Sequence, residues 1–494
     1  MKLTIQIICF FIAIFSIVAQ NDIPSDYLTS EFHKSRRDAL RADMSKNTVA
    51  LFFANAVRNR ANDVEYVYHQ DPNFYYLTGY KEPNAVLVIF SDKQTNDKGD
   101  TYNELLYVQK RNALAEQWTG KRLGVEGAQQ QLGFEIALNG EEFIKNGINF
   151  ANFDAVMFEA FKDDYRDSNR DDADLFDLIK AFKSQIDLIQ TTFISTNQMN
   201  LELNGNGNAI QKKKATVDNE TLSKLMAGLR EVKTEDEMVL LTKAVRISAM
   251  GQREIMKAMH IGMSEAEIQG IHEYVYKKYG SEYEGYPSIV GAGNNGCVLH
   301  YIENTKMKVD NDLVLMDLGA EYHGYTADVT RTIPANGKFN PEQKLIYDLV
   351  YEAQEAGIAV SVIGNNLRTP DDAARKVVNE GLIALGIAKD DTEARRYFPH
   401  GTSHHIGLDV HDTSLRGAFK PNMVITVEPG IYIPEGSPCD KKWWGIAVRI
   451  EDDVLITENG PVVLSAEAPR KSEAIEALMK ETSPLGSLEL PTLD

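Results

Sequence analysis

The chain has 494 residues, 43% of them hydrophobic and 25% charged, which is ordinary for a globular protein. A chain of this length is too long to fold around a single hydrophobic core of ordinary size, which predicts two domains with short terminal segments. The formal net charge is −20 and no long run of Lys or Arg is present. Nucleic acid or an anionic membrane is therefore disfavoured as a partner, because binding either one needs a positive surface.

The first nineteen residues have the pattern of a secretory signal peptide. Lys2 precedes an apolar run of thirteen residues, Ile7 to Ala19, and Pro24 follows shortly afterwards. The run is short for a membrane span, which needs roughly 20 apolar residues, so an anchor is the weaker interpretation. We expect residues 1–19 to be removed and the mature protein to be exported, periplasmic or secreted, without membrane attachment.

Residues 20–205 are expected to form a small α/β domain. A polar-amphipathic segment predicts a helix, and three short apolar runs have the length of strands. The helix is expected at 35–44 and the strands at 49–55, 85–90 and 104–108.

A Gly/Asn-rich stretch followed by three lysines interrupts the pattern of apolar and polar residues, which predicts a linker at 206–222. A second domain is expected at 223–475, with a C-terminal tail at 476–494. Thr234 and Glu237 have the spacing of a capping box, so a helix should begin there, and another should follow Ser264. The later elements are expected as strands at 312–317, 325–332, 422–427 and 445–451, and as helices at 341–357 and 371–386.

Gly291, Gly293 and Gly296 form a G-x-G-x-x-G motif, and Asp317 lies about 20 residues beyond it. A dinucleotide site requires a helix after the third glycine, but the strand-like sequence C-V-L-H-Y follows here. We interpret the glycines as a tight turn. The chain also lacks H-E-x-x-H, G-x-S-x-G and P-loop motifs, which excludes the commonest metalloprotease, serine hydrolase and NTPase sites.

Several potential metal ligands occur in the strand-rich second half. Asp317 ends the run L-V-L-M-D, and a Gly-containing turn separates it from Asp328, so a hairpin could bring the two carboxylates together. A lone acidic residue is usually solvated, yet an unpaired carboxylate at the end of an apolar strand is costly to bury. Metal coordination removes that cost. Carboxylates with an imidazole suit Mn, Co or Zn. The further candidates are His404, Glu428 and Glu451.

The motifs around these residues resemble those of the aminopeptidase P branch of the pita-bread metallopeptidases. The similar strings in the second half are H-G-T-S-H-H-I-G-L-D-V-H-D, V-E-P-G-I-Y and R-I-E-D-D, and in the first half D-V-E-Y, F-Y-Y-L-T-G and W-T-G-K-R-L-G. The resemblance covers about residues 30–475. It implies a pita-bread catalytic domain of α/β (α+β) class, preceded by a smaller α/β domain.

The resemblance implies two divalent ions, manganese first and zinc or cobalt as alternatives. Asp317 would hold one ion, Asp328 and Glu451 would bridge both, and His404 and Glu428 would complete the second. A hydroxide bridging the ions would attack the peptide bond, with Glu428 as general base. The implied reaction removes the first residue from peptides whose second residue is proline.

By the same resemblance, three further histidines are expected to contact the substrate: His300, His400 and His411. Arg449 is expected to steady Asp328 or the substrate, and Tyr432 is a candidate for the substrate pocket. The family forms dimers or tetramers in which the small domain reaches a neighbour's active site. Asp63 and Trp118 are the candidates for that contact.

Two other functions remain open. A prolidase, which cleaves only Xaa-Pro dipeptides, has the same fold and metal ligands, although the first-half motifs favour the aminopeptidase. A non-enzymatic pita-bread protein would lack the ligand set that is complete here.

Overall fold

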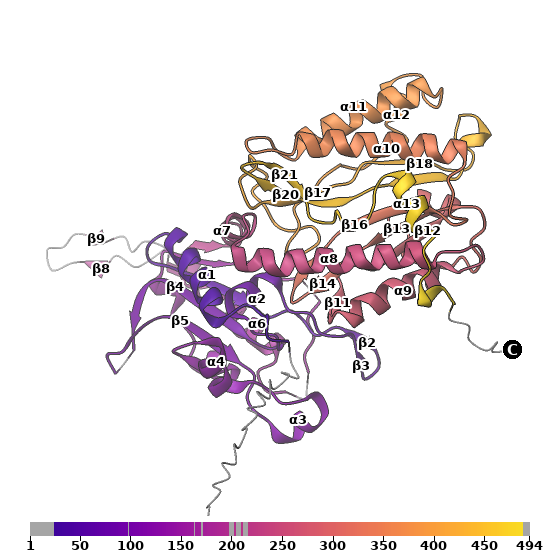
Figure 1. The fold of residues 1–494 in the computed structure, drawn as a ribbon. Coiled ribbons are helices and arrows are strands. Elements are labelled where there is room, and N and C mark those ends of the chain that lie inside the picture. Colours follow the sequence, from indigo (N-terminus) through magenta and orange to yellow (C-terminus); the bar gives the residue numbers. More distant parts are fainter. Residues whose placement is uncertain are drawn as a thin grey trace, which may run out of the picture.

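The structure, a computed structural model, describes residues 24–487 apart from positions 97, 163, 169–170, 197–201, 204–208 and 211–215. The chain forms a smaller domain, indigo to violet in Figure 1, and a larger one, magenta to yellow. The predicted signal peptide, residues 1–19, lies outside the described residues. Within the described part of the chain, none of the helices combines the length and the hydropathy that a membrane crossing needs.

A six-stranded mixed sheet forms the centre of the smaller domain, in the order β10-β7-β1-β4-β5-β6. In β1, Ala50 and Phe52 enter one core, and Val49 and Leu51 enter another. Because successive side chains of a strand point to opposite faces, both faces of the sheet are buried. The bounds are β1 Thr48–Phe53, β4 Val86–Thr95, β5 Thr101–Val108, β6 Ala137–Asn139, β7 Ala155–Phe158 and β10 Thr216–Asp218.

Helices and two short hairpins complete this domain. The predicted first helix is present, but it begins five residues earlier than expected because the Thr29 hydroxyl caps it by accepting the N–H of Phe32 at 3.2 Å. The bounds are α1 Ser30–Asp43, α2 Pro72–Thr78, α3 Ala113–Thr119, α4 Gly124–Leu132, α5 Gly140–Lys145, η1 Phe150–Asn152 and α6 Leu175–Thr196, with hairpin strands β2 Asn59–Ala61, β3 Val64–Glu65, β8 Glu202–Leu203 and β9 Ala209–Ile210.

The helices of the larger domain follow the capping signals closely. Both Thr234 and Ser264 form complete capping boxes, at the starts of α8 and α9. The bounds are α7 Thr221–Arg230, α8 Glu235–Ala258, α9 Glu265–Lys278, α10 Pro341–Ala359, α11 Arg368–Ala384, α12 Asp391–Ala394 and α13 Ser472–Leu478.

The strands of the larger domain form small antiparallel sheets between two helical layers (Figure 1). Helix α8 packs on β14, β15 and β16 on one side, and α10 packs on β17, β18 and β19 on the other. The strand orders are β12-β13-β16, β11-β14-β15, β17-β20-β21 and β18-β19. The bounds are β11 Tyr283–Glu284, β12 Ile289–Ala292, β13 Leu313–Leu318, β14 Ala320–Tyr322, β15 Tyr325–Thr326, β16 Val329–Pro334, β17 Val424–Val427, β18 Gly430–Ile433, β19 Ile446–Arg449, β20 Asp452–Thr457 and β21 Gly460–Val463.

Two strand predictions are wrong in detail. The strand expected at 325–332 is interrupted at Ala327 and Asp328, where the chain leaves one sheet and enters another. The segment C-V-L-H-Y forms no strand, because it lies at the surface, with Val298 54% exposed, and pairs with no neighbour. The glycines before it do form a turn, the 3-10 helix η2 Gly293–Cys297, as expected.

The domain ends differ from the expected linker and tail. Strand β10 lies within the segment predicted as linker, yet it pairs in parallel with β7 and extends the sheet of the smaller domain. In the predicted tail, the 3-10 helix η4 Pro484–Ser487 packs against α8. The described part of the tail is therefore docked on the larger domain.

Residues 24–29 form an N-terminal arm at the boundary between the domains. An Asp26 carboxylate oxygen lies 3.0 Å from Nε2 of His323, and the Tyr27 ring stacks on the His323 ring with centroids 3.6 Å apart. The ammonium group of Lys81, from the smaller domain, lies 3.2 Å from the centroid of the Tyr27 ring. The arm therefore contacts both domains at once.

Candidate metal centre

Two carboxylates of the site come from adjacent positions in one sheet. Asp317 belongs to β13, and Asp328 immediately precedes β16, which pairs antiparallel with β13. The Tyr286 hydroxyl lies 2.6 Å from Oδ1 of Asp317 and also contacts Oδ1 of Asp328. Because a hydroxyl carries one hydrogen, it can donate to only one of these carboxylates at a time. The antiparallel pairing of β13 with β16 brings Asp317 and Asp328 together, as the predicted hairpin requires.

Two more carboxylates stand at strand ends in the other half of the domain. Glu428 follows β17, and its backbone N–H donates to the carbonyl oxygen of Thr402 at 2.8 Å. Glu451 lies between β19 and β20, and the Thr330 hydroxyl donates to its Oε2 at 2.6 Å. The ends of four strands thus deliver the four acidic side chains to one place.

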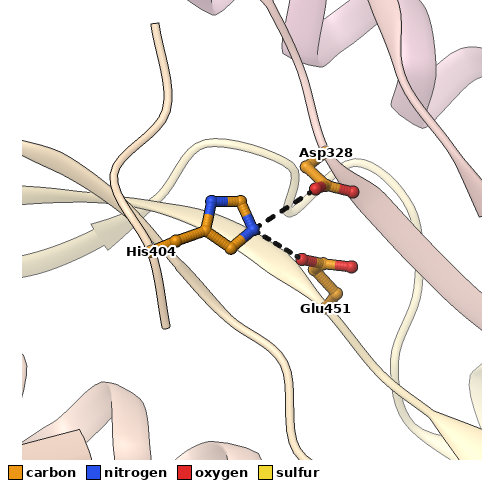
Figure 2. A group of neighbouring side chains, drawn as sticks. All are labelled: Asp328, His404 and Glu451. Atoms are coloured by element: carbon orange, nitrogen blue, oxygen red, sulfur yellow. Dashed lines mark ion pairs between the residues drawn. The ribbon is translucent and has the colours of Figure 1, made fainter. Parts of the chain in front are cut away.

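His404 lies beside three of these carboxylates, and Figure 2 shows it with Asp328 and Glu451. Its Nε2 is 3.5 Å from Asp328, 3.4 Å from Glu428 and 4.0 Å from Glu451, while its Nδ1 lies 3.1 Å from the carbonyl oxygen of His405. If Nδ1–H donates to that carbonyl, the lone pair of Nε2 faces the carboxylates, as it does in histidines that bind metal. Asp328, His404 and Glu451 place ligand atoms within 4.8 Å of one another.

The electrostatics of the site disfavour several carboxylates in their ionised form. Burial raises the pKa of Glu428 to about 7 against the opposing effect of His404, and burial with the charge of Asp328 raises the pKa of Glu451 well above its usual range. Burial also raises the pKa of Asp328, and the charge of Asp317 adds to it. At Asp317 burial opposes ionisation, but the Arg449 guanidinium and the Tyr286 hydroxyl together lower the pKa of that carboxyl. Burial, together with repulsion between neighbouring carboxylates, therefore disfavours the ionised form of Asp328, Glu428 and Glu451.

The donor set fits divalent metal ions. Oε1 of Glu451 and Oδ1 of Asp453 are buried and have no hydrogen-bond partner among the described residues. Unpartnered buried carboxylate oxygens are costly, and a cation among them would satisfy them and offset their repulsion. Oxygen ligands with one imidazole suit hard or borderline ions.

A hydrogen-bonded chain lies beside the carboxylates. Arg449 donates to Oδ2 of Asp317 at 2.6 Å and to the Tyr432 hydroxyl at 2.8 Å, and that hydroxyl lies 2.7 Å from Nε2 of His400. Burial and the charge of Arg449 lower the pKa of His400 to about 4. Arg449 therefore steadies Asp317 rather than Asp328, which corrects the first of the two alternatives expected for it.

The other histidines and the small-domain residues lie farther out. The His411 ring stands perpendicular to the His404 ring, with centroids 4.5 Å apart, and burial lowers its pKa. His300 is exposed in the turn after η2. Asp63, in the β2–β3 turn, and Trp118, 88% exposed on α3, contact none of the candidate ligands within this chain.

Three residues of the site escaped the sequence reasoning. Tyr286 precedes β12 in a segment that carries no metal-site motif, so its contact with two carboxylates had no signal. Thr330 reads as an ordinary strand residue. Asp453 had a signal, because three consecutive carboxylates in R-I-E-D-D cannot all face solvent from buried strands; its Oδ2 accepts the backbone N–H of Asp328 at 3.1 Å.

Comparisons with known proteins agree with this geometry. A model of metallopeptidase family M24 matches residues 239–458, and a model of the aminopeptidase P N-terminal domain matches residues 33–148. The chain is 34% identical to the Xaa-Pro aminopeptidase of Escherichia coli K12 over 475 residues, which cover 92% of this chain and 98% of that protein. It is 31% identical to human Xaa-Pro aminopeptidase 3, covering 88% of this chain and 81% of that protein.

Solved structures give the same relationship. The structure of Escherichia coli aminopeptidase P with the inhibitor Pro-Leu superposes with a TM-score of 0.78 at 33% identity, covering 92% of this chain and 99% of that one. Proline aminopeptidase P II from Yersinia pestis gives a TM-score of 0.78 at 32% identity, covering 92% and 100%. The chain is an enzyme of the aminopeptidase P (Xaa-Pro aminopeptidase) family, with the N-terminal domain of that family and a pita-bread domain of M24 metallopeptidase type.

Proposed function

We propose that this enzyme uses two divalent metal ions to remove the N-terminal residue from peptides whose second residue is proline. The observation that carries the proposal is the convergence of Asp328, Glu428 and Glu451 on Nε2 of His404, in a chain aligned over nearly its whole length with Xaa-Pro aminopeptidases. Asp317, Asp328, His404, Glu428 and Glu451 would hold the two ions.

Ions held there would supply Lewis acidity, which activates water and polarises the scissile carbonyl group. Glu428 would take the proton of the attacking water and pass it towards the leaving nitrogen of proline. A carboxylate beside metal-activated water can accept its proton, because coordination lowers the pKa of that water. Arg449 would hold Asp317 in place through their 2.6 Å contact.

The histidines and Tyr432 would contact the substrate. His300, His400 and His411 are proposed to bind the scissile carbonyl, the proline end and the oxyanion that forms at the attacked carbon. His400 lies with Nδ1 3.7 Å from Glu428, and His411 packs against His404, so both face the ligand group. Donors aimed at developing charge act mainly on turnover.

A dedicated active site is needed because the Xaa-Pro bond is unusual. The nitrogen of that bond carries no hydrogen, and its ring fixes φ, so peptidases that need the N–H or a narrow substrate reject it. We propose manganese as the native metal, with zinc or cobalt as the alternatives. Metal analysis of protein purified without added metal decides between them.

We also propose a homodimer or homotetramer in which the smaller domain reaches a neighbour's active site. Asp63 on the β2–β3 hairpin and the 88% exposed Trp118 on α3 would make that contact. The exposure of an indole ring of this size supports a protein partner at α3. Light scattering of the purified protein, coupled to gel filtration, measures the oligomeric state.

Export follows from the pattern of residues 1–19 and is likewise a proposal. The mature protein is expected to begin near Gln20. Intact-mass measurement on protein recovered from the periplasm or medium tests this. A membrane-bound species that keeps residues 1–19 would indicate an anchor.

Substrate length separates the aminopeptidase from a prolidase. We expect hydrolysis of an Xaa-Pro-Xaa tripeptide to be efficient and hydrolysis of an Xaa-Pro dipeptide to be poor. The reverse preference would identify a prolidase. Absence of both activities in metal-loaded protein would favour a binding function.

A further inference from the structure

Two side chains of helix α11 hold the segment that carries His400. Arg375 donates from Nη1 to the carbonyl oxygen of Phe398 at 2.9 Å and from Nη2 to the carbonyl oxygen of His400. One helical turn earlier, Asp371 accepts the Nε–H of Arg375 at 2.8 Å and the Thr402 hydroxyl at 2.9 Å. The pair therefore binds the backbone on one side of His400 and a side chain on the other.

The segment 398–402 depends on these contacts for its conformation. It contains no strand, and the backbone bonds around it lie at its edges, from the N–H of Tyr432 to Tyr397 and from the N–H of Glu428 to Thr402. Between these two points, the guanidinium group of Arg375 donates to the carbonyl oxygens of Phe398 and His400, and Nδ1 of His400 lies 2.8 Å from the carbonyl oxygen of Gly401. A planar guanidinium with donors in a fixed fork suits two neighbouring carbonyls, which a lysine ammonium cannot match.

The same segment positions two residues of the proposed mechanism. The His400 ring reaches the Tyr432 hydroxyl at 2.7 Å, and the Thr402 carbonyl accepts the N–H of Glu428 at 2.8 Å. The Arg375 guanidinium carbon also lies 4.4 Å from the centroid of the Phe398 ring, whose edge packs against the His400 ring. A shift of this segment would therefore move a substrate-binding donor and the general base together.

We propose that Arg375 and Asp371 are positioning residues that align His400, and through Thr402 also Glu428, for turnover. Neither side chain touches the candidate metal ligands directly, so their effect is on alignment and not on metal binding. The role of His400 in turnover rests on the proposed function, whereas the hydrogen bonds from Arg375 to the backbone at Phe398 and His400 do not.

The helix supplies a matched control. Arg368 and Asp372 have the same four-residue spacing on α11, but they are 85% and 65% exposed, 3.5 Å apart, and contact nothing in the site. The variants are Arg375→Met, Arg375→Lys, Asp371→Asn and the control Arg368→Met, each compared with the parent for metal content, thermal midpoint and steady-state hydrolysis of an Xaa-Pro-Xaa tripeptide.

We expect Arg375→Met to keep its metal and fold while kcat falls roughly 10- to 100-fold and KM changes less than about threefold, since loss of an outer orienting partner typically has this effect. Asp371→Asn should lose less, because an amide oxygen can still accept from Thr402. Arg375→Lys should recover little, and added guanidinium ion should partly restore Arg375→Met. Arg368→Met should match the parent.

A second measurement does not depend on the substrate. Peptide mapping after brief treatment with diethyl pyrocarbonate reports how freely the His400 ring reacts. We expect faster modification of His400 in Arg375→Met than in the parent or in Arg368→Met. Equal modification rates, or a parent-like kcat in Arg375→Met, would overturn the inference. A different outcome would contradict only the proposed function. In that outcome the parent enzyme does not hydrolyse the tripeptide, but His400 is still modified faster in Arg375→Met than in the parent.

Discussion

Gly319 follows directly after β13, between Asp317 and Asp328 in sequence, and the structure leaves no room for a side chain at this position. A Cβ atom at this position would lie 2.0 Å from the carbonyl oxygen of Ala327 and 2.7 Å from Cε1 of Tyr286. Ordinary van der Waals contact begins near 3.4 Å, so the Gly319→Ala substitution would push the Ala327 carbonyl back by about 1.4 Å. That carbonyl immediately precedes Asp328, and Tyr286 is hydrogen-bonded to Asp317.

The expected cost follows from which atoms must move. A backbone carbonyl cannot rotate away as a side chain can, and overpacking of this kind costs about 1–3 kcal/mol or more. We expect Gly319→Ala to lower the free energy of unfolding by about 2–3 kcal/mol, and metal affinity to fall because Asp328 and Tyr286 are displaced together. Urea unfolding curves, metal analysis after dialysis and tripeptide turnover measure the three effects.

The same substitution elsewhere provides the control. Gly270 lies on the exposed side of α9, and a Cβ there would meet open space. Because glycine is unfavourable within a helix, Gly270→Ala should stabilise by about 0.5–1 kcal/mol and leave metal and turnover unchanged. If Gly319→Ala has the same urea midpoint as the parent and retains its metal, the close packing between Gly319 and Ala327 does not determine the position of the metal ligands.

Three further outcomes are expected. His404→Ala should lose metal, because it removes a proposed ligand. His300→Ala, His400→Ala and His411→Ala should keep both ions, while turnover falls by roughly 10²–10³-fold, as when a transition-state donor is removed. Normal turnover in His411→Ala would show that this histidine does not act in turnover. Burial lowers the pKa of His272 to about 3, so between about pH 3 and 6.5 the unfolded chain binds one more proton than the folded chain. This group should therefore make the protein less stable as the pH is lowered from about 6.5 to 3, and His272→Leu should reduce that slope by about 1.4 kcal/mol per pH unit in urea titrations. Trp118→Ala should weaken self-association on light scattering without changing the thermal midpoint, because the indole is 88% exposed in the chain.

Much of the catalytic framework was predictable because several of its signals are local. Thr234 and Ser264 cap helices through contacts within three residues, and both predicted starts are correct. A carboxylate that ends an apolar strand is conspicuous in sequence, and this pattern pointed to Asp317 and Glu428. The glycine turn was distinguished from a dinucleotide loop for the same reason, since a helix after it would have left a local pattern.

The contacts between sheets were not predictable in this way. Arg449 reaches Asp317 because β19 packs against β13, and nothing in the spacing to Glu451 specifies that sheet packing. In the sequence Tyr286 has the pattern of an aromatic core residue, and only the tertiary structure places its hydroxyl against Asp317 and Asp328. Strand β10 is short and follows a polar segment, so its pairing with β7 depends on tertiary structure and not on its own propensity.

The N-terminal arm has a consequence for the order in which the chain can fold during its synthesis. Asp26 and its partner His323 are 297 residues apart in sequence. At about 5–20 residues per second, roughly 15–60 seconds separate the synthesis of the two residues. During that interval the smaller domain can fold, but Tyr27 has no His323 ring to stack on. Docking of the arm is therefore a late step, and it can occur only on a chain whose β14–β15 hairpin has already emerged from the ribosome.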